Sequence, residues 1–75
     1  MTETPLLTII VNGETVSFSL EDFPGSVGAL ITVLAFPEEH VVAEVNGELV
    51  KRSDIASRSL TPGDKVELVR FVGGG

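Results

Sequence analysis

The chain has 75 residues, no cysteine and a formal net charge of −6. This length supports one small domain, which must be stable without disulfides, and the lack of cysteine excludes a thiol nucleophile or a persulfide on this chain. Residues 1–50 hold eight acidic and no basic residues (−8), whereas residues 51–75 hold five basic and three acidic residues (+2). Five scattered cations on an acidic domain argue against nucleic-acid binding.

Two further sequence features bear on location. The first residues, MTETP, lack the basic region of a secretory signal. The longest apolar run, residues 29–36, is far shorter than the about 20 residues that cross a bilayer. We therefore expect a soluble cytoplasmic protein that binds no membrane and is monomeric when free. The acidic surface either steers encounters with a basic partner or only keeps the domain soluble.

The first predicted elements are two strands and a tight turn. Apolar residues alternate with others along residues 7–11, a strand pattern. Asn12-Gly13 follows, and such a pair favours a type I′ hairpin turn because both positions need positive φ. Val16, Phe18 and Leu20 then alternate with serines and predict the returning strand.

A helix is predicted next, after a loop at residues 21–25. Ser26 is the expected N-cap. Apolar residues then recur from Val27 to Leu34 at the spacing of one helix face, and Pro37 is expected to mark the end of the helix. The other face has no charge, so either a partner covers it or it is an unremarkable surface; it comprises Gly28, Ala29, Thr32 and Val33.

The second half predicts three more strands. Residues 41–45 alternate as a strand, Asn46-Gly47 forms a second tight turn, and residues 49–50 pair back briefly. Residues 53–58 are expected to form a loop or a single helical turn, and residues 61–64 (TPGD) a β-turn. Residues 65–69 alternate as the last strand.

The predicted order is thus ββαβββ in an α+β domain. Packing the single helix on one face of a mixed sheet of four to five strands is the simplest way to bury its apolar face. This is the β-grasp, or ubiquitin-like, arrangement, and we expect the last strand to lie centrally beside the first. The domain is expected to span residues 1–72, and residues 73–75 to form a flexible tail.

The side chains offer little independent chemistry. A serine nucleophile needs a general base held against it, but the only imidazole, His40, follows two glutamates in a polar loop. No glycine-rich phosphate-binding motif and no metal-ligand cluster are present. Asp54 and Asp64 lie in turn contexts, where bonds to the backbone explain them. We expect no catalysis by this chain, and neither a cofactor nor a metal bound to it.

The sequence Phe71-Val72-Gly73-Gly74-Gly75 is the most informative segment. Glycine has no Cβ and can pass through a narrow channel. We expect Gly73 and Gly74 to thread into a partner's active site and to deliver a terminal carboxylate on Gly75. If the buried residues of the last strand are Val66 and Leu68, then Val69 and Phe71 point outward, with Val42 as their neighbour. These three apolar residues are a candidate partner contact.

Residues 45–53 (VNGELVKRS) and 63–75 (GDKVELVRFVGGG) resemble the pattern of the thiamine-pathway sulfur carrier family (ThiS). Residues 9–14 (IIVNGE) resemble the opening hairpin of that family. The resemblance implies that a ThiF-like enzyme uses ATP and Mg²⁺ to adenylate Gly75. It further implies that a persulfide donor such as a cysteine desulfurase supplies sulfur, and that the resulting thiocarboxylate serves a ThiG-like thiazole synthase.

Three alternatives stay open at the level of sequence. The small subunit of molybdopterin synthase (MoaD-like) shares the fold and activation chemistry, but that family tends to have prolines before its Gly-Gly, and residues 70–72 have none. A carrier for another sulfur pathway is the second alternative. The third is a ubiquitin-like protein modifier or a binding module with an inert tail, which a thiocarboxylate on Gly75 would exclude.

Overall fold

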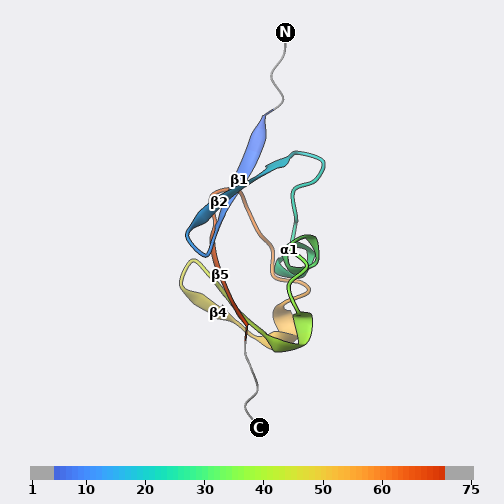
Figure 1. Cartoon of the computed structure of the whole chain (residues 1–75), viewed down its shortest axis with the longest axis vertical. Helices are drawn as coiled ribbons and strands as arrows, with labels where there is room; N and C mark the ends of the chain where they lie inside the picture. Colours follow the sequence, from blue (N-terminus) through green and yellow to red (C-terminus); the bar gives the residue numbers. More distant parts are fainter. Residues whose placement is uncertain (1–4, 71–75) are drawn as a thin grey trace.

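In the described part of the chain, five strands form one sheet, and a single α-helix lies against one of its faces (Figure 1). The computed structural model describes residues 5–70. Two short 3₁₀ helices, η1 and η2, flank the second hairpin. The elements in chain order are β1 (Leu6–Val11), β2 (Glu14–Ser19), α1 (Val27–Val33), η1 (Glu38–His40), β3 (Val41–Val45), β4 (Glu48–Val50), η2 (Arg52–Asp54) and β5 (Lys65–Arg70). The predicted order ββαβββ is confirmed.

The sheet has the strand order β2-β1-β5-β3-β4, so the last strand lies at its centre. Strand β5 runs parallel to β1 and antiparallel to β3, and the other pairs are antiparallel hairpins. The expected mixed sheet and the central place of the last strand are therefore confirmed, and the arrangement is the β-grasp. Of the predicted domain, residues 1–4 and 71–72 lie outside the described residues, as does the whole predicted tail.

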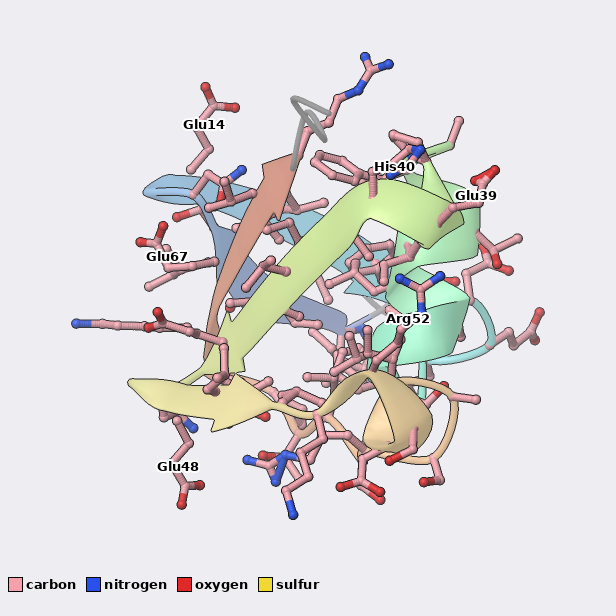
Figure 2. All side chains as sticks on the ribbon, turned by 90° about the horizontal axis from the view of Figure 1, so that it is seen from below. Glu14, Glu39, His40, Glu48, Arg52 and Glu67 are labelled. Carbon is pink, nitrogen blue, oxygen red and sulfur yellow. The ribbon has the colours of Figure 1, made fainter. Side chains whose placement is uncertain are left out.

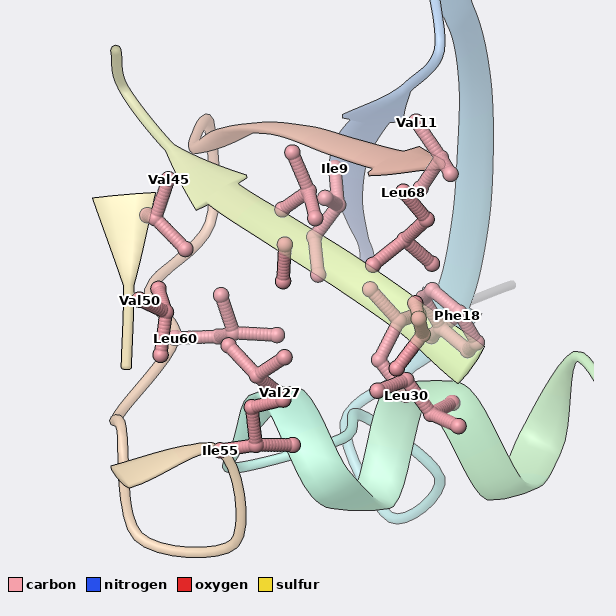
Figure 3. Close-up of a cluster of buried hydrophobic side chains, with 14 residues drawn as sticks. Ile9, Val11, Phe18, Val27, Leu30, Val45, Val50, Ile55, Leu60 and Leu68 are labelled. Carbon is pink, nitrogen blue, oxygen red and sulfur yellow. The ribbon is translucent and has the colours of Figure 1, made fainter. Parts of the chain in front are cut away.

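The core lies between α1 and the inner face of the sheet (Figure 3). Val27, Leu30 and Ile31 of the helix are buried, as the helical spacing predicts. They meet the inward-facing residues of all five strands and two residues of the 51–64 segment. These partners are Ile9, Val11, Phe18, Val41, Ala43, Val45, Val50, Ile55, Leu60, Val66 and Leu68. In β3 and β5 the buried and exposed residues alternate as the sequence predicts.

The predicted turns are present with the backbone geometry that their residues favour. Asn12 and Gly13 have φ of 48° and 83°, and Asn46 and Gly47 have φ of 52° and 85°. Positive φ at both positions is the signature of a type I′ turn. The β-turn at residues 61–64 is closed by a bond from the Asp64 N–H to the Thr61 carbonyl, 3.2 Å long.

Two predicted element ends are wrong, that of β2 and that of α1. Strand β2 ends at Ser19, and Leu20 is 58% exposed. The chain turns there because the Asp22 N–H donates to the Ser19 carbonyl and the Ser19 hydroxyl to the Asp22 carboxylate.

The helix begins as predicted but ends early. The Ser26 hydroxyl accepts from the Ala29 N–H at 3.1 Å, which confirms the N-cap. The last helical residue is Val33, before Pro37, because Ala35 adopts φ of 55°.

The uncharged face of the helix is partly covered by the chain itself, since Gly28 is half-buried against residues 55–56. Within residues 5–70 no helix has the length and apolar character needed to cross a bilayer.

Candidate partner-binding surface

Strand β5 is the element that leads toward the glycine segment. It pairs with β3 along all of its residues but Lys65, from Val45–Val66 to Val41–Arg70. On its other edge, β1 pairs with it only at Ile10–Lys65 and Val11–Val66. The predicted functional residues Phe71, Gly73, Gly74 and Gly75 lie outside the described residues.

The outer face of β3 and β5 carries the other two predicted contact residues. Val42 and Val69 are directly paired across the two strands. Val69 is 55% exposed and Val42 is 38% exposed, so both side chains are presented on the face away from α1. The predicted neighbour relation and outward direction hold for Val42 and Val69, whereas contact with a partner stays a prediction.

Next to this apolar pair lies a pair of like charges that the sequence analysis missed. Glu44 and Glu67 are direct cross-strand partners on the same outer face, with exposed Leu49 beside Glu44 on β4. Figure 2 shows Glu67 pointing away from the helix. Within residues 5–70 the single ion pair is Arg58–Glu48 at 3.5 Å, so neither Glu44 nor Glu67 forms an ion pair there. Like charges directly opposite each other destabilise a sheet. We call Val42, Glu44, Leu49, Glu67 and Val69 the outer patch.

Two asparagine side chains bind the backbone of β5 from opposite edges. The Asn12 amide bonds Leu68 twice: its Oδ1 accepts from the Leu68 N–H at 2.8 Å, and its Nδ2 donates to the Leu68 carbonyl at 3.1 Å. On the other edge, Asn46 Oδ1 accepts from the Lys65 N–H at 2.9 Å. The Asn-Gly pairs predicted the turns, but nothing local in the sequence indicates contacts between residues 56 positions apart.

Asp64 closes the turn that starts β5. Its carboxylate accepts from the Thr61 N–H at 2.8 Å, from the Thr61 hydroxyl at 3.2 Å and from Asn46 Nδ2 at 3.0 Å. Partial burial raises the pKa of this carboxyl, but these hydrogen bonds and the charge of Arg58 outweigh it and hold the pKa below its ordinary value. The turn context predicted for Asp64 is confirmed.

The remaining polar residues form no catalytic arrangement in the described part of the chain. His40 is exposed on η1, as predicted for a solvated loop histidine. Arg52 points from η2 toward η1 (Figure 2), where its Nη1 donates to the Glu39 carbonyl at 2.9 Å. An open groove beside this bond is lined by Glu39, Arg52, Ile55 and Ala56. These contacts join two loops, which is a structural role.

The fold, the central last strand and the exposed face beside it define the class: this is a β-grasp protein. A profile described as the ThiS family matches residues 9–75, which include β5 and the glycine segment. The chain therefore belongs to the ThiS family.

Solved structures and a curated relative agree with this family. The crystal structure of the thiamine biosynthesis protein ThiS from Geobacter metallireducens superimposes with a TM-score of 0.74 at 30% identity, covering 92% of this chain and all of that one. The solution structure of a thiamine biosynthesis protein from the same organism gives 0.72 at 31% identity, covering 92% of this chain and 88% of that one. A thiazole synthase of Paramagnetospirillum magneticum is 36% identical over 69 residues, which are 92% of this chain. The chain spans only 20% of the length of that enzyme.

Proposed function

We propose that this protein is the sulfur carrier for synthesis of the thiazole of thiamine, and that the sulfur is carried as a thiocarboxylate on Gly75. The observation that carries the proposal is the family match over residues 9–75, since it includes the glycine segment itself. The proposal requires Gly75 to be the carboxyl-terminal residue of the working carrier. Under this proposal the chain is a substrate of partner enzymes and not itself an enzyme, and it acts in the cytoplasm.

The chemistry follows from the reactivity of a carboxylate. Its negative charge repels nucleophiles, so it needs a leaving group before it can be attacked. A Gly75 oxygen attacks the α-phosphorus of Mg·ATP on the ThiF-like enzyme, releases pyrophosphate and forms an acyl-adenylate. The terminal sulfur of a partner persulfide attacks the acyl carbon and displaces AMP, which leaves an acyl disulfide. A thiol reductant then cleaves the S–S bond and releases the thiocarboxylate. The absence of cysteine means that this chain holds no sulfur as a persulfide.

A thiazole synthase is the proposed acceptor of the sulfur. Support comes from the curated relative, a thiazole synthase that contains a segment resembling almost all of this chain. A segment of this kind inside the enzyme suits a carrier that acts directly on such an enzyme. The same observation favours thiazole synthesis over the MoaD-like and ubiquitin-like alternatives. The persulfide donor is proposed to be a cysteine desulfurase.

The proposed contact surface for these partners is formed by Val42, Val69 and Phe71. The exposed Val42–Val69 pair lies at the end of β5 from which the chain continues toward Gly75. An enzyme that receives the glycine segment would therefore meet this pair as well. Apolar residues exposed together at such a place are typical of protein interfaces.

The test is the intact mass of the carrier after incubation with the ThiF-like enzyme, Mg·ATP, a persulfide donor and a thiol. The mass should rise by the difference between one sulfur and one oxygen, the change should map to the peptide that contains Gly75, and it should require ATP. A carrier with one residue added after Gly75 is the matched control and should stay unmodified. If the unextended carrier keeps its mass with every ThiF-like enzyme of its host, the proposal is wrong.

A further inference from the structure

The two turn asparagines differ in which end of β5 they hold. Asn12 and Asn46 both precede a glycine, both have φ near 50°, and both bind β5 through the side chain. The Asn46 side chain holds Lys65, the first residue of the strand, through one exposed bond and Asp64, the residue before it, through another. Asn12 holds Leu68, two residues before the last described residue of β5, through two bonds that are partly buried. Asn12 therefore acts nearer to the glycine segment.

The Asn12 side chain extends the parallel ladder past the end of β1. Its backbone N–H still donates to the Val66 carbonyl at 2.9 Å, as the next residue of a strand would. The backbone then turns away at Gly13, so no further residue of β1 can reach Leu68. A side-chain amide has the same donor and acceptor as a peptide group. The Asn12 amide fills that role at Leu68 and leaves neither backbone group of Leu68 without a partner.

From these contacts we infer that Asn12 is a positioning residue for the carrier reaction. Its amide fixes the end of β5 to the sheet, and so fixes the direction in which the strand presents the following residues to the adenylating enzyme. Without it, every residue of β5 after Val66 would be held on one edge only, by β3. This inference rests on the proposed function, because it assigns the carboxylate of Gly75 as the group that must be delivered.

The effect on the reaction has a definite kinetic form. A strand end that opens locally is present in its binding-competent arrangement for only a fraction of the time. The adenylating enzyme must then order the strand when it binds, which raises the KM for the carrier. Once the carrier is bound the acyl group reacts as before, so kcat changes little.

The experiment compares Asn12→Gly with the matched control Asn46→Gly. Glycine keeps the positive φ of each turn and removes the side-chain bonds. It adds similar backbone freedom in both variants, so this effect cancels in the comparison. Loss of two hydrogen bonds worth about 0.5–1.5 kcal/mol each predicts that amide exchange at Leu68 accelerates about tenfold or more in Asn12→Gly. The KM for the carrier in ATP–pyrophosphate exchange should rise by the reciprocal of the fraction of molecules in which the strand end stays closed, with kcat nearly unchanged. A tenfold rise corresponds to a closed fraction of about one tenth. In Asn46→Gly the faster exchange should be at Lys65, and KM should stay close to that of the unchanged protein.

Several outcomes would overturn the inference. One is loss of protection at Leu68 with an unchanged KM; another is an equal rise of KM in Asn46→Gly, which would indicate general destabilisation. If Asn12→Gly does not fold, Asn12→Asp takes its place, because aspartate tolerates this backbone conformation and keeps the acceptor for the Leu68 N–H while losing the donor. It should also raise KM, because a carboxylate oxygen in place of the amide nitrogen repels the Leu68 carbonyl. An unchanged KM with faster Leu68 exchange would again overturn the inference. If the unchanged carrier supports no ATP–pyrophosphate exchange, the proposed function fails. Amide exchange at Leu68 then still shows whether the Asn12 side chain holds this residue.

Discussion

Three residues other than glycine hold positive φ within residues 5–70, and they do so for different reasons. Asn12 and Asn46 tolerate the left-handed region because a short amide side chain bonds nearby backbone. Ala35 has no such group, and its φ of 55° is set by the end of α1. The Ala35 N–H bonds the Thr32 carbonyl at 3.1 Å, and the Phe36 N–H bonds the Ile31 carbonyl at 3.0 Å. This pair of bonds is a Schellman motif, which satisfies the last helical carbonyls and ends the helix.

The Asp64 carboxylate contributes to the stability of the domain, and this contribution is lost at acid pH. Its pKa in the folded protein lies below the ordinary value of 3.8. The unfolded chain therefore takes up the proton first as the pH falls, so the contribution is complete above pH 3.8 and is lost as the pH falls through the folded-state pKa. Asp64→Asn should lower the free energy of unfolding at neutral pH, and its difference from the unchanged protein should shrink as the pH falls below 3.8. Urea unfolding at several pH values measures this, and a difference that stays constant with pH would contradict it.

At the scale of elements, the start of α1 is held by the segment after η2. The Val27 N–H donates to the Arg58 carbonyl and the Gly28 N–H to the Ile55 carbonyl, both at 2.9 Å. These are early amides of the helix, which have no partner within the helix itself. The close approach of the two backbones leaves room for hydrogen alone at position 28, since a Cβ there would lie 3.0 Å from the Ala56 Cα.

This packing predicts that Gly28→Ala destabilises the protein although alanine favours helices. The gain in helix propensity is about 1 kcal/mol, whereas overpacking against a held backbone costs about 1–3 kcal/mol. We expect a net loss of about 1 kcal/mol in the free energy of unfolding, measured by urea denaturation. Gly25→Ala is the matched control, because a Cβ at position 25 meets nothing within 4 Å, and it should be nearly neutral. Stabilisation by Gly28→Ala would mean that residues 55–56 move aside freely.

The local patterns in the sequence predicted most of this fold, because each depends on neighbouring residues. The two Asn-Gly turns, the Ser26 cap and the alternation in β3 are of this kind. What the sequence could not predict arises between distant segments or from backbone geometry. The Asn12–Leu68 bonds need the β1–β5 register, and the pairing of Glu44 with Glu67 needs that of β3 and β5. The early end of α1 depends on a positive φ at Ala35, and alanine disfavours this backbone conformation.

At the scale of the whole molecule, the two layers present different surfaces. The sheet layer exposes the outer patch, in which an apolar pair lies beside two carboxylates that form no ion pair in the described residues. The helix layer exposes Val33, which is 57% exposed on an uncharged surface. Since Val33 and Val69 are equally exposed, burial alone does not indicate which layer meets a partner. The position of Val69 in the chain, four residues before Gly73, favours the outer patch. Glu44 and Glu67, which form no ion pair in the described residues, favour a partner surface with a basic residue.

The comparison of Val69→Gln with Val33→Gln tests whether the sheet layer or the helix layer binds the partner. Both changes replace a half-exposed valine by a neutral polar side chain, so neither should alter the free energy of unfolding by more than about 0.5 kcal/mol. Covering the exposed part of one valine in an interface is worth about 1 kcal/mol or somewhat more. Val69→Gln should therefore weaken binding to the proposed ThiF-like enzyme by about tenfold, measured by calorimetric titration, while Val33→Gln leaves binding unchanged. The affinity of the unchanged carrier should also fall with added salt, because exposed charge pairs are screened. If Val33→Gln weakens binding and Val69→Gln does not, the partner meets the helix layer and the assignment of the outer patch is wrong.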